Sequence, residues 1–229
     1  MPDVLPHIGT LREKPLHASL KEWYRQHGDL VESAVDGYVI DLVRDGLLIE
    51  IQTRGFAALK RKVGTLLDLG HSIRIVHPIP VDKWIVRIDP EGTIIGRRRS
   101  PNHGSAVDIA AELVSFPERL ADQGLKIEVV LINEEEYRVH TPDRSWRRRG
   151  WSVVERRLLD VVDSTLISSP SQLARLLPEV LPDPFTTTDI AAHLGRPLRT
   201  AQQLAYCLKG CRMISPVGKR GNSVLYQQR

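Results

Sequence analysis

The chain has only two cysteines, no long apolar run, no low-complexity tract and no internal repeat. No apolar stretch approaches the ~18 residues that a membrane-spanning helix requires, and the N-terminus lacks the apolar core of a signal peptide. Cys207 and Cys211 stand one helical turn apart, and no third cysteine exists to complete a zinc site. We therefore expect a soluble, cytoplasmic protein without a membrane partner, in which both thiols pack as small apolar side chains.

What the chain does have is an uneven charge. The formal net charge of +4 divides into −3 over the first 144 residues and +7 from Ser145 to the end. A basic tail suits a polyanion, and an acidic body can reserve carboxylates for another purpose, although solubility alone would also account for the split. With 229 residues and 41% hydrophobic content, the chain can form one large domain or two modest ones.

The first two-thirds of the chain alternates helical and strand patterns. A helix is predicted from Pro15 to Gly28, and an Asp-Gly turn at residues 44–46 joins two strands. Farther along we expect, in order, a helix over 56–70, strands over 72–79 and 83–89 joined by a proline-containing turn, a helix over 105–114 and a strand over 125–139. This order predicts an α/β fold with a mixed central sheet flanked by helices.

A basic stretch with a proline and a glycine then interrupts the pattern. We place a linker at residues 144–150, between a first domain of residues 1–143 and a second of residues 151–229. The second domain is predicted to open with a helix over 151–164, begun by a Ser-x-x-Glu cap. Near the C-terminus we expect a short capped helix, a glycine-containing turn, a helix opened by Pro197 and two short strands.

Carboxylates stand out in the predicted hairpin. Glu50 and Gln52 share one face of their strand, and the turn brings Asp41 of the other strand beside them, among apolar neighbours. Carboxylates in an apolar sheet are costly unless they are paired or bind a cation, and a small number of oxygen ligands suits Mg²⁺. The alternative is that both acids are ordinary solvent-facing residues of an exposed hairpin.

This arrangement resembles the PD-(D/E)XK nuclease superfamily, whose signature is an Asp on one strand and Glu-x-Lys on the next. Asp41 matches the first acid, Glu50 the second, and Gln52 stands in the place of the lysine. Ile40 replaces a frequent proline of the family. The resemblance covers about residues 10–135. It implies a restriction-endonuclease-like fold, Mg²⁺ or Mn²⁺ held by Asp41 and Glu50, and hydrolysis of DNA phosphodiester bonds.

Two further residues are candidates for this site. Glu13 lies just ahead of the first helix, where the family often carries a Glu, although a carboxylate there also favours a helix N-terminus. Lys60 falls on the apolar stripe of its helix and could supply the positive charge that Gln52 lacks, unless its side chain extends past the helix edge into solvent. We expect His17 and His77 to pack or form hydrogen bonds rather than bind metal.

The last segment, residues 184–229, resembles a winged helix-turn-helix domain, which makes the second domain mostly α. In that family the second helix enters the major groove of DNA and the hairpin touches the backbone. The resemblance therefore assigns base contacts to Arg199, Thr200, Gln202 and Gln203, and phosphate contacts to Lys219 and Arg220. The alternative is that this segment contacts another protein.

Together these patterns predict a Mg²⁺-dependent DNA endonuclease with a C-terminal DNA reader, in which Gln52 or Lys60 orients the nucleophile. A non-catalytic DNA-binding regulator that keeps the nuclease fold as a scaffold is the alternative. A nuclease fold used only for partner contacts is a third. Pairing into a homodimer, which would let one site per chain cut both strands, is left open.

Overall fold

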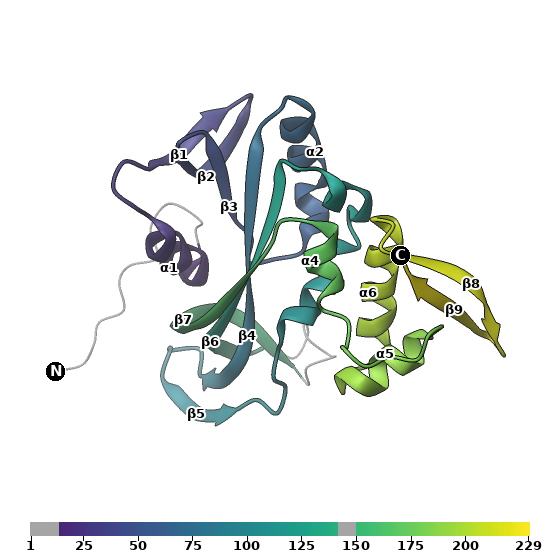
Figure 1. The fold of residues 1–229 in the computed structure, drawn as a ribbon. Helices are drawn as coiled ribbons and strands as arrows, with labels where there is room; N and C mark the ends of the chain where they lie inside the picture. Colours follow the sequence, from purple (N-terminus) through teal and green to yellow (C-terminus); the bar gives the residue numbers. More distant parts are fainter. Residues whose placement is uncertain (1–13, 142–149) are drawn as a thin grey trace.

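The computed structural model describes residues 14–141 and 150–229, and its centre is a seven-stranded mixed sheet (Figure 1). The strands are β1 (Leu30–Val35), β2 (Tyr38–Arg44), β3 (Leu47–Ile51), β4 (Ser72–Ile88), β5 (Ile94–Arg99), β6 (Leu125–His140) and β7 (Trp151–Ile167). Their order is β1-β2-β3-β4-β6-β7, with β5 beside the second half of β4. Because β3, β4 and β6 are parallel and their other neighbours antiparallel, the predicted mixed α/β sheet is confirmed.

Helices lie on both sides of the sheet (Figure 1). On one side is α1 (Pro15–Tyr24), whose Leu16 and Leu20 pack on apolar residues of β2, β3, β4 and β6. Helical spacing predicts an apolar stripe of Leu16, Leu20, Trp23 and Tyr24; all are buried except Trp23, which is 53% exposed. The other side carries η1 (Phe56–Leu59), α2 (Lys60–Asp68), η2 (Ala106–Ile109), α3 (Ala110–Leu113), η3 (Pro117–Ala121), α4 (Pro170–Ala174), α5 (Thr187–Leu194) and α6 (Leu198–Gly210).

Two Asp-Gly turns build the first three strands. Asp45 and Gly46 both have positive φ, at 47° and 81°, which is the backbone of the tight hairpin turn predicted there. Asp36 and Gly37 repeat this conformation, with φ of 45° and 81°. The second turn adds β1, a strand that the sequence reading missed although the same dipeptide marks it.

The predicted strands 72–79 and 83–89 form one continuous strand, β4, so the proline-containing turn predicted between them is wrong. Pro78 and Pro80 pair with β6, and the register shifts between Pro80 and Asp82. On its other side β4 has left β3 after Val76 and meets β5 only at Trp84. A proline lacks the N–H that a central strand needs. The prolines are tolerated because, between Val76 and Trp84, one edge of β4 pairs with neither β3 nor β5.

The helix predicted over residues 151–164 is also wrong, because this segment is strand β7. It pairs antiparallel with β6, and the pairing runs from Trp151 opposite His140 to Ile167 opposite Ile127. Doubled apolar residues and a Ser-x-x-Glu sequence imitate a helix, but the many valines also suit a strand, and β6 supplies the partner. The first seventeen residues of the predicted second domain therefore belong to the central sheet.

The C-terminal elements agree with the predicted pattern. The Asp189 carboxylate accepts the Thr186 N–H at 2.8 Å at the start of α5. Gly195 ends that helix with a φ of 60°. After α6, strands β8 (Ile214–Arg220) and β9 (Ser223–Gln228) pair as a hairpin that projects from the molecule in Figure 1. Among the described residues, no helix is long and apolar enough to cross a bilayer.

The sheet and the C-terminal elements share one apolar core. It includes Phe56 beside the sheet together with Ile190 of α5 and Leu204 of α6. The Cys207 thiol lies 3.7 Å from the Ala110 carbonyl of α3, and both cysteines are free and buried, as predicted. The two parts are therefore packed as one unit.

We expect Leu204→Ala to lower the free energy of unfolding of the whole chain by about 2–5 kcal/mol, because it opens a cavity in the shared core. Trp84 and Trp151 lie on strands of the sheet and no tryptophan follows Trp151, so tryptophan fluorescence follows the sheet and far-UV circular dichroism follows all helices. Both signals should shift together in urea. Leu198→Ala, on the same helix but 45% exposed, is the control. An unchanged fluorescence midpoint in Leu204→Ala would show that the two parts unfold independently.

Candidate active site

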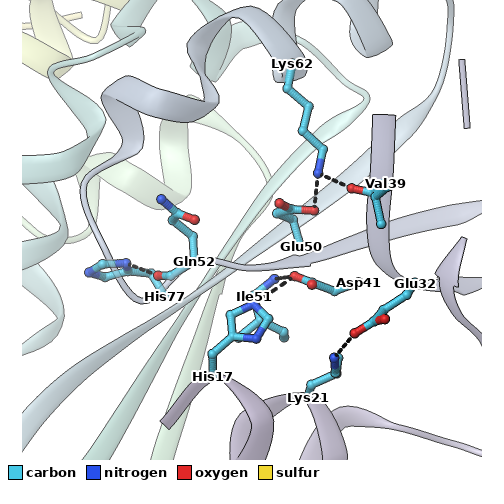
Figure 2. Close-up of polar contacts among 10 residues, drawn as sticks. All are labelled: His17, Lys21, Glu32, Val39, Asp41, Glu50, Ile51, Gln52, Lys62 and His77. Atoms are coloured by element: carbon cyan, nitrogen blue, oxygen red, sulfur yellow. Dashed lines mark hydrogen bonds and ion pairs between the residues drawn. The ribbon is translucent and has the colours of Figure 1, made fainter. Parts of the chain in front are cut away.

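The β2–β3 hairpin separates into a fork away from its turn. Antiparallel pairing ends at Leu42 and Ile49, so the next residues, Asp41 and Glu50, lie where the two strands part. Beyond this point β3 pairs only with β4 among the described residues. Figure 2 shows both carboxylates at the fork. The structure thus brings together the two acids that the sequence singled out.

The Asp41 carboxylate fills the fork. Its Oδ2 accepts a hydrogen bond from the Ile51 N–H at 2.7 Å, which gives this backbone donor a partner where β2 has left the sheet. His17 of α1 places Nε2 3.3 Å from the same oxygen. Burial raises the pKa of Asp41, but the hydrogen bonds from His17 and Ile51 and the charge of His17 outweigh burial and lower the pKa below its usual value. Asp41 is therefore held ionised.

Glu50 has the opposite balance. Its Oε2 accepts a hydrogen bond from Lys62 Nζ at 2.6 Å, and the same ammonium donates to the Val39 carbonyl at 2.6 Å. Burial raises the pKa of Glu50, the negative charge of Asp41 raises it further, and Lys62 offsets only part of this. Two adjacent carboxylates with pKa values shifted in opposite directions are typical of sites that bind cations or transfer protons.

Lys62, and not Lys60, reaches these carboxylates, so the predicted direction of Lys60 is wrong. The Lys60 side chain is 61% exposed, and its Nζ lies 4.0 Å from Glu118. The two lysines flank the buried Val63 and Leu66 of α2 on different sides, because successive helix residues are about 100° apart. The flank that faces the β2–β3 hairpin carries Lys62.

Gln52 lies two residues after Glu50 and on the same side in Figure 2. Its side-chain Nε2 donates to the Gly55 carbonyl at 3.0 Å, and its backbone carbonyl accepts a hydrogen bond from His77 Nδ1 at 2.6 Å. Farther along, the Phe56 N–H donates to the Glu112 carboxylate at 3.0 Å. These bonds anchor the loop of residues 53–55 at both ends.

The predicted metal ligands are few. Within residues 14–141 and 150–229, no group of three or more His, Cys, Asp or Glu side chains could hold a metal ion. The bonds described above use Oδ2 of Asp41 and Oε2 of Glu50, so the second oxygen of each carboxylate suits a cation that keeps most of its waters, as Mg²⁺ does. A metal at Asp41 and Glu50 stays a prediction, and Glu13 lies outside the described residues.

Two adjoining cavities open beside these residues. The smaller, of 520 Å³, is lined by Asp41, His17 and Gln52 among others. The larger, of 1140 Å³, lies between the sheet and the start of α6; its lining includes His77, Lys83, Arg138, Arg156, Arg196 and Thr200. Lys14, Thr53 and Arg54 line both cavities, so the two adjoin at these residues, and we refer to them together as the hollow.

A buried ion cluster on β6 neutralises part of this lining. Glu134 and Glu136 are 1% and 2% exposed. Lys83 Nζ lies 2.9 Å from Glu134 Oε1 and 3.2 Å from Glu136 Oε2, and Arg138 Nε donates to Glu136 at 2.7 Å. Burial raises the pKa of Glu136, but the charge of Lys83 and the contact with Arg138 outweigh it and lower the pKa. Lys83 and Arg138 are thus matched by buried acids.

The predicted reader residues differ in exposure. On α6, Arg199 and Gln202 are exposed, whereas Thr200 and Gln203 are half-buried. Tyr206 and Lys209 extend the exposed stripe by helical spacing and were not predicted. On the hairpin, Lys219 is exposed, and Arg220 turns back to Asp189 at 3.2 Å and to the Pro184 carbonyl at 3.4 Å.

Sequence reasoning missed the place of His17 and Lys62 beside the acids, and Arg54 and Arg156 at the hollow. Lys62 carried a signal, since a lysine next to a buried helix stripe can reach a neighbouring sheet. Arg156 was hidden by the false helix over 151–164. Arg54 carried none, because a loop side chain has no periodic pattern that reveals its direction.

The chain belongs to the family described as Domain of unknown function (DUF8091), which it matches over residues 14–168. The matched span runs from α1 to one residue beyond β7, so it contains the whole sheet and both acids. The chain is also similar to an uncharacterized protein of Treponema pallidum (strain Nichols), at 30% identity over 225 residues that cover 96% of this chain and 87% of that protein. No solved structure matches the chain.

The charge balance at the fork makes a directional prediction for the pKa of Glu50, measured by carboxyl-carbon NMR titration. Asp41→Asn should lower this pKa because a nearby negative charge is removed, and Lys62→Met should raise it because the neutralising ammonium is lost. Lys60→Met is the matched control and should leave the pKa unchanged. A shift in Lys60→Met as large as that in Lys62→Met would contradict the arrangement of α2 described above.

Proposed function

We propose that the chain is a metal-dependent DNA endonuclease that hydrolyses phosphodiester bonds. The observation that carries this proposal is the pair of carboxylates, Asp41 and Glu50, at a fork in the sheet where Asp41 lines an open cavity. Their placement on adjacent strands, with a helix after β3 and the parallel strand β4, also agrees with the PD-(D/E)XK pattern. We propose DNA as the partner because carboxylates, a cationic hollow and a basic C-terminal segment occur together.

Each residue of the fork has a distinct part in this proposal. Asp41 and Glu50 would hold Mg²⁺ or Mn²⁺, which when bound activates a water and offsets charge on the scissile phosphate. His17 orients Asp41 through Oδ2, and Lys62 orients Glu50 through Oε2. The Lys62 ammonium takes the part first assigned to Lys60, a positive charge beside the reacting phosphate. Gln52 adds an amide that can position the water.

The C-terminal elements are proposed to form a winged-helix DNA reader. A capped helix, a glycine-ended turn, a second helix and a hairpin support this assignment. Arg199, Thr200, Gln202 and Gln203 would face base edges, and Lys219 and Arg220 would face phosphates. A homodimer that brings two sites to one duplex, and a reducing cytoplasm for the free thiols, are part of the same proposal.

A non-catalytic DNA-binding regulator is the second candidate. It is favoured by the fact that each acid already has a nitrogen partner, the His17 imidazole for Asp41 and the Lys62 ammonium for Glu50. Such pairs can satisfy buried carboxylates without a metal. The two candidates differ in whether the purified chain nicks DNA when Mg²⁺ is added.

For an endonuclease, we expect Mg²⁺-dependent nicking of a supercoiled plasmid that falls by about 100-fold or more in Asp41→Asn and Glu50→Gln, because the metal contributes several kcal/mol to the transition state. DNA affinity in EDTA should stay roughly unchanged. Lys62→Met should also lose cleavage, and Lys60→Met should cleave like the native chain. Full cleavage by the Asp41→Asn, Glu50→Gln double variant would place the chemistry elsewhere.

The reader makes a separate prediction about salt. Lys219→Ala should lower the slope of log affinity against log salt by about 0.9, the value for one lost phosphate contact on duplex DNA. Arg220→Ala should change the slope less, because its guanidinium is engaged with Asp189. The measurement is fluorescence anisotropy with the full chain, with exposed Arg212→Ala as control. Equal slopes in the native chain and Lys219→Ala would favour a protein-contact role for the hairpin.

A further inference from the structure

The hollow beside the fork has a cationic centre that the proposed chemistry does not use. Lys14 and Arg54 line both cavities, and Arg156 of β7 lines the larger one. They come from three separate elements: the residue before α1, the loop after β3, and the edge strand. The smaller cavity continues from this group to Asp41 and Gln52.

Most cations of the lining have acidic partners, and among the three named above Arg156 has one too, Glu136 at 3.5 Å. Lys83 and Arg138 are bonded to the buried acids of β6, and Arg196 Nη2 lies 3.1 Å from Asp108. Lys14 is in a different environment. Its pKa is lowered first by burial and then by the positive charges of Arg54 and Arg156. All three line the larger cavity, where like charges repel one another, so the group favours an anion between them.

The backbone on either side of Arg54 is held in place without a ligand. The loop of residues 53–55 is held at one end by the bond from His77 to the Gln52 carbonyl and at the other by the bond from Phe56 to Glu112. Arg156 sits on β7, and its Nε lies 3.5 Å from Glu136. A guanidinium on an anchored backbone loses little freedom when it binds a phosphate.

The hollow is large enough to hold a segment of a polymer. The larger cavity alone, at 1140 Å³, exceeds the ~300–1,000 Å³ of common small-molecule pockets. It leads from the cations to Thr200, in the first turn of the helix proposed to read DNA. One strand of nucleic acid along this path would meet the carboxylates, the cations and α6 in turn.

We infer that Lys14, Arg54 and Arg156 form a phosphate subsite that binds the nucleic-acid backbone next to the phosphodiester held at Asp41. This inference rests on the proposed function, which makes nucleic acid the substrate. It goes further because it assigns contact with the nucleic-acid backbone to residues in and beside the central sheet as well as to the C-terminal segment. The guanidinium groups suit phosphate because each can donate two parallel hydrogen bonds to its oxygens.

The test is DNA binding without cleavage, measured by anisotropy of labelled duplex and single-stranded oligonucleotides with the full chain in EDTA. Arg54→Gln and Arg156→Gln should each weaken binding about tenfold. Each should also lower the salt slope on duplex by about 0.9. Arg175→Gln is the matched control, because Arg175 is exposed and lines neither cavity. Unfolding midpoints check the fold, and Arg54→Gln alone decides the matter if Arg156→Gln is unstable.

The double variant combines Arg54→Gln and Arg156→Gln. The subsite would be overturned if its DNA affinity and salt slope equalled those of Arg175→Gln. A second outcome would also overturn it: inorganic phosphate competes for the native chain but not for the double variant, while both bind the oligonucleotide equally well. That result would indicate a small phosphorylated ligand. Because no cleavage is measured, these outcomes are separate from the nicking experiment. Nicking with unaltered binding would leave the endonuclease intact and remove only the subsite.

Discussion

Where β2 leaves β3, the backbone N–H of Ile51 loses the strand partner that the preceding residues have. A buried donor without an acceptor is costly, and the Asp41 carboxylate supplies the acceptor. This bond also places a negative charge on a strand whose adjacent residues, Ile40 and Leu42, are buried and apolar, next to the second acid, Glu50. Most of the chemistry around the fork follows from the need to balance these two charges.

The side chains that contact the two acids come from both sides of the sheet. His17 belongs to α1 on one side and contacts Asp41, whereas Lys62 belongs to α2 on the other and contacts Glu50. Each acid is therefore fixed by its own helix, and the pKa values of the two move in opposite directions. Stability alone does not favour such an arrangement, since apolar residues fill a sheet at lower cost, and this is the physical argument for a function at the fork.

Positive charge around the cavities differs in how closely acids balance it. On β6 the buried acids hold Lys83 and Arg138 and also contact Arg156, while Lys14 and Arg54 lie where the two cavities adjoin. The shared apolar core fixes α6 against α3, so the exposed stripe of α6 keeps a constant position relative to the fork. A ligand that spans both regions would bind a preformed surface.

Several features could be predicted from the sequence because their causes lie within a few residues. Asp-Gly dipeptides adopt the positive φ of a tight turn, alternation places Glu50 and Gln52 together, and the cap of α5 is formed by residues three apart. Other features depend on distant partners. Residues 151–167 became a strand because β6 offered an edge, and Lys62 rather than Lys60 reached Glu50 because packing set the rotation of α2. A local pattern contains neither the neighbouring strand nor the rotation of a helix against its sheet, so only the tertiary structure decided them.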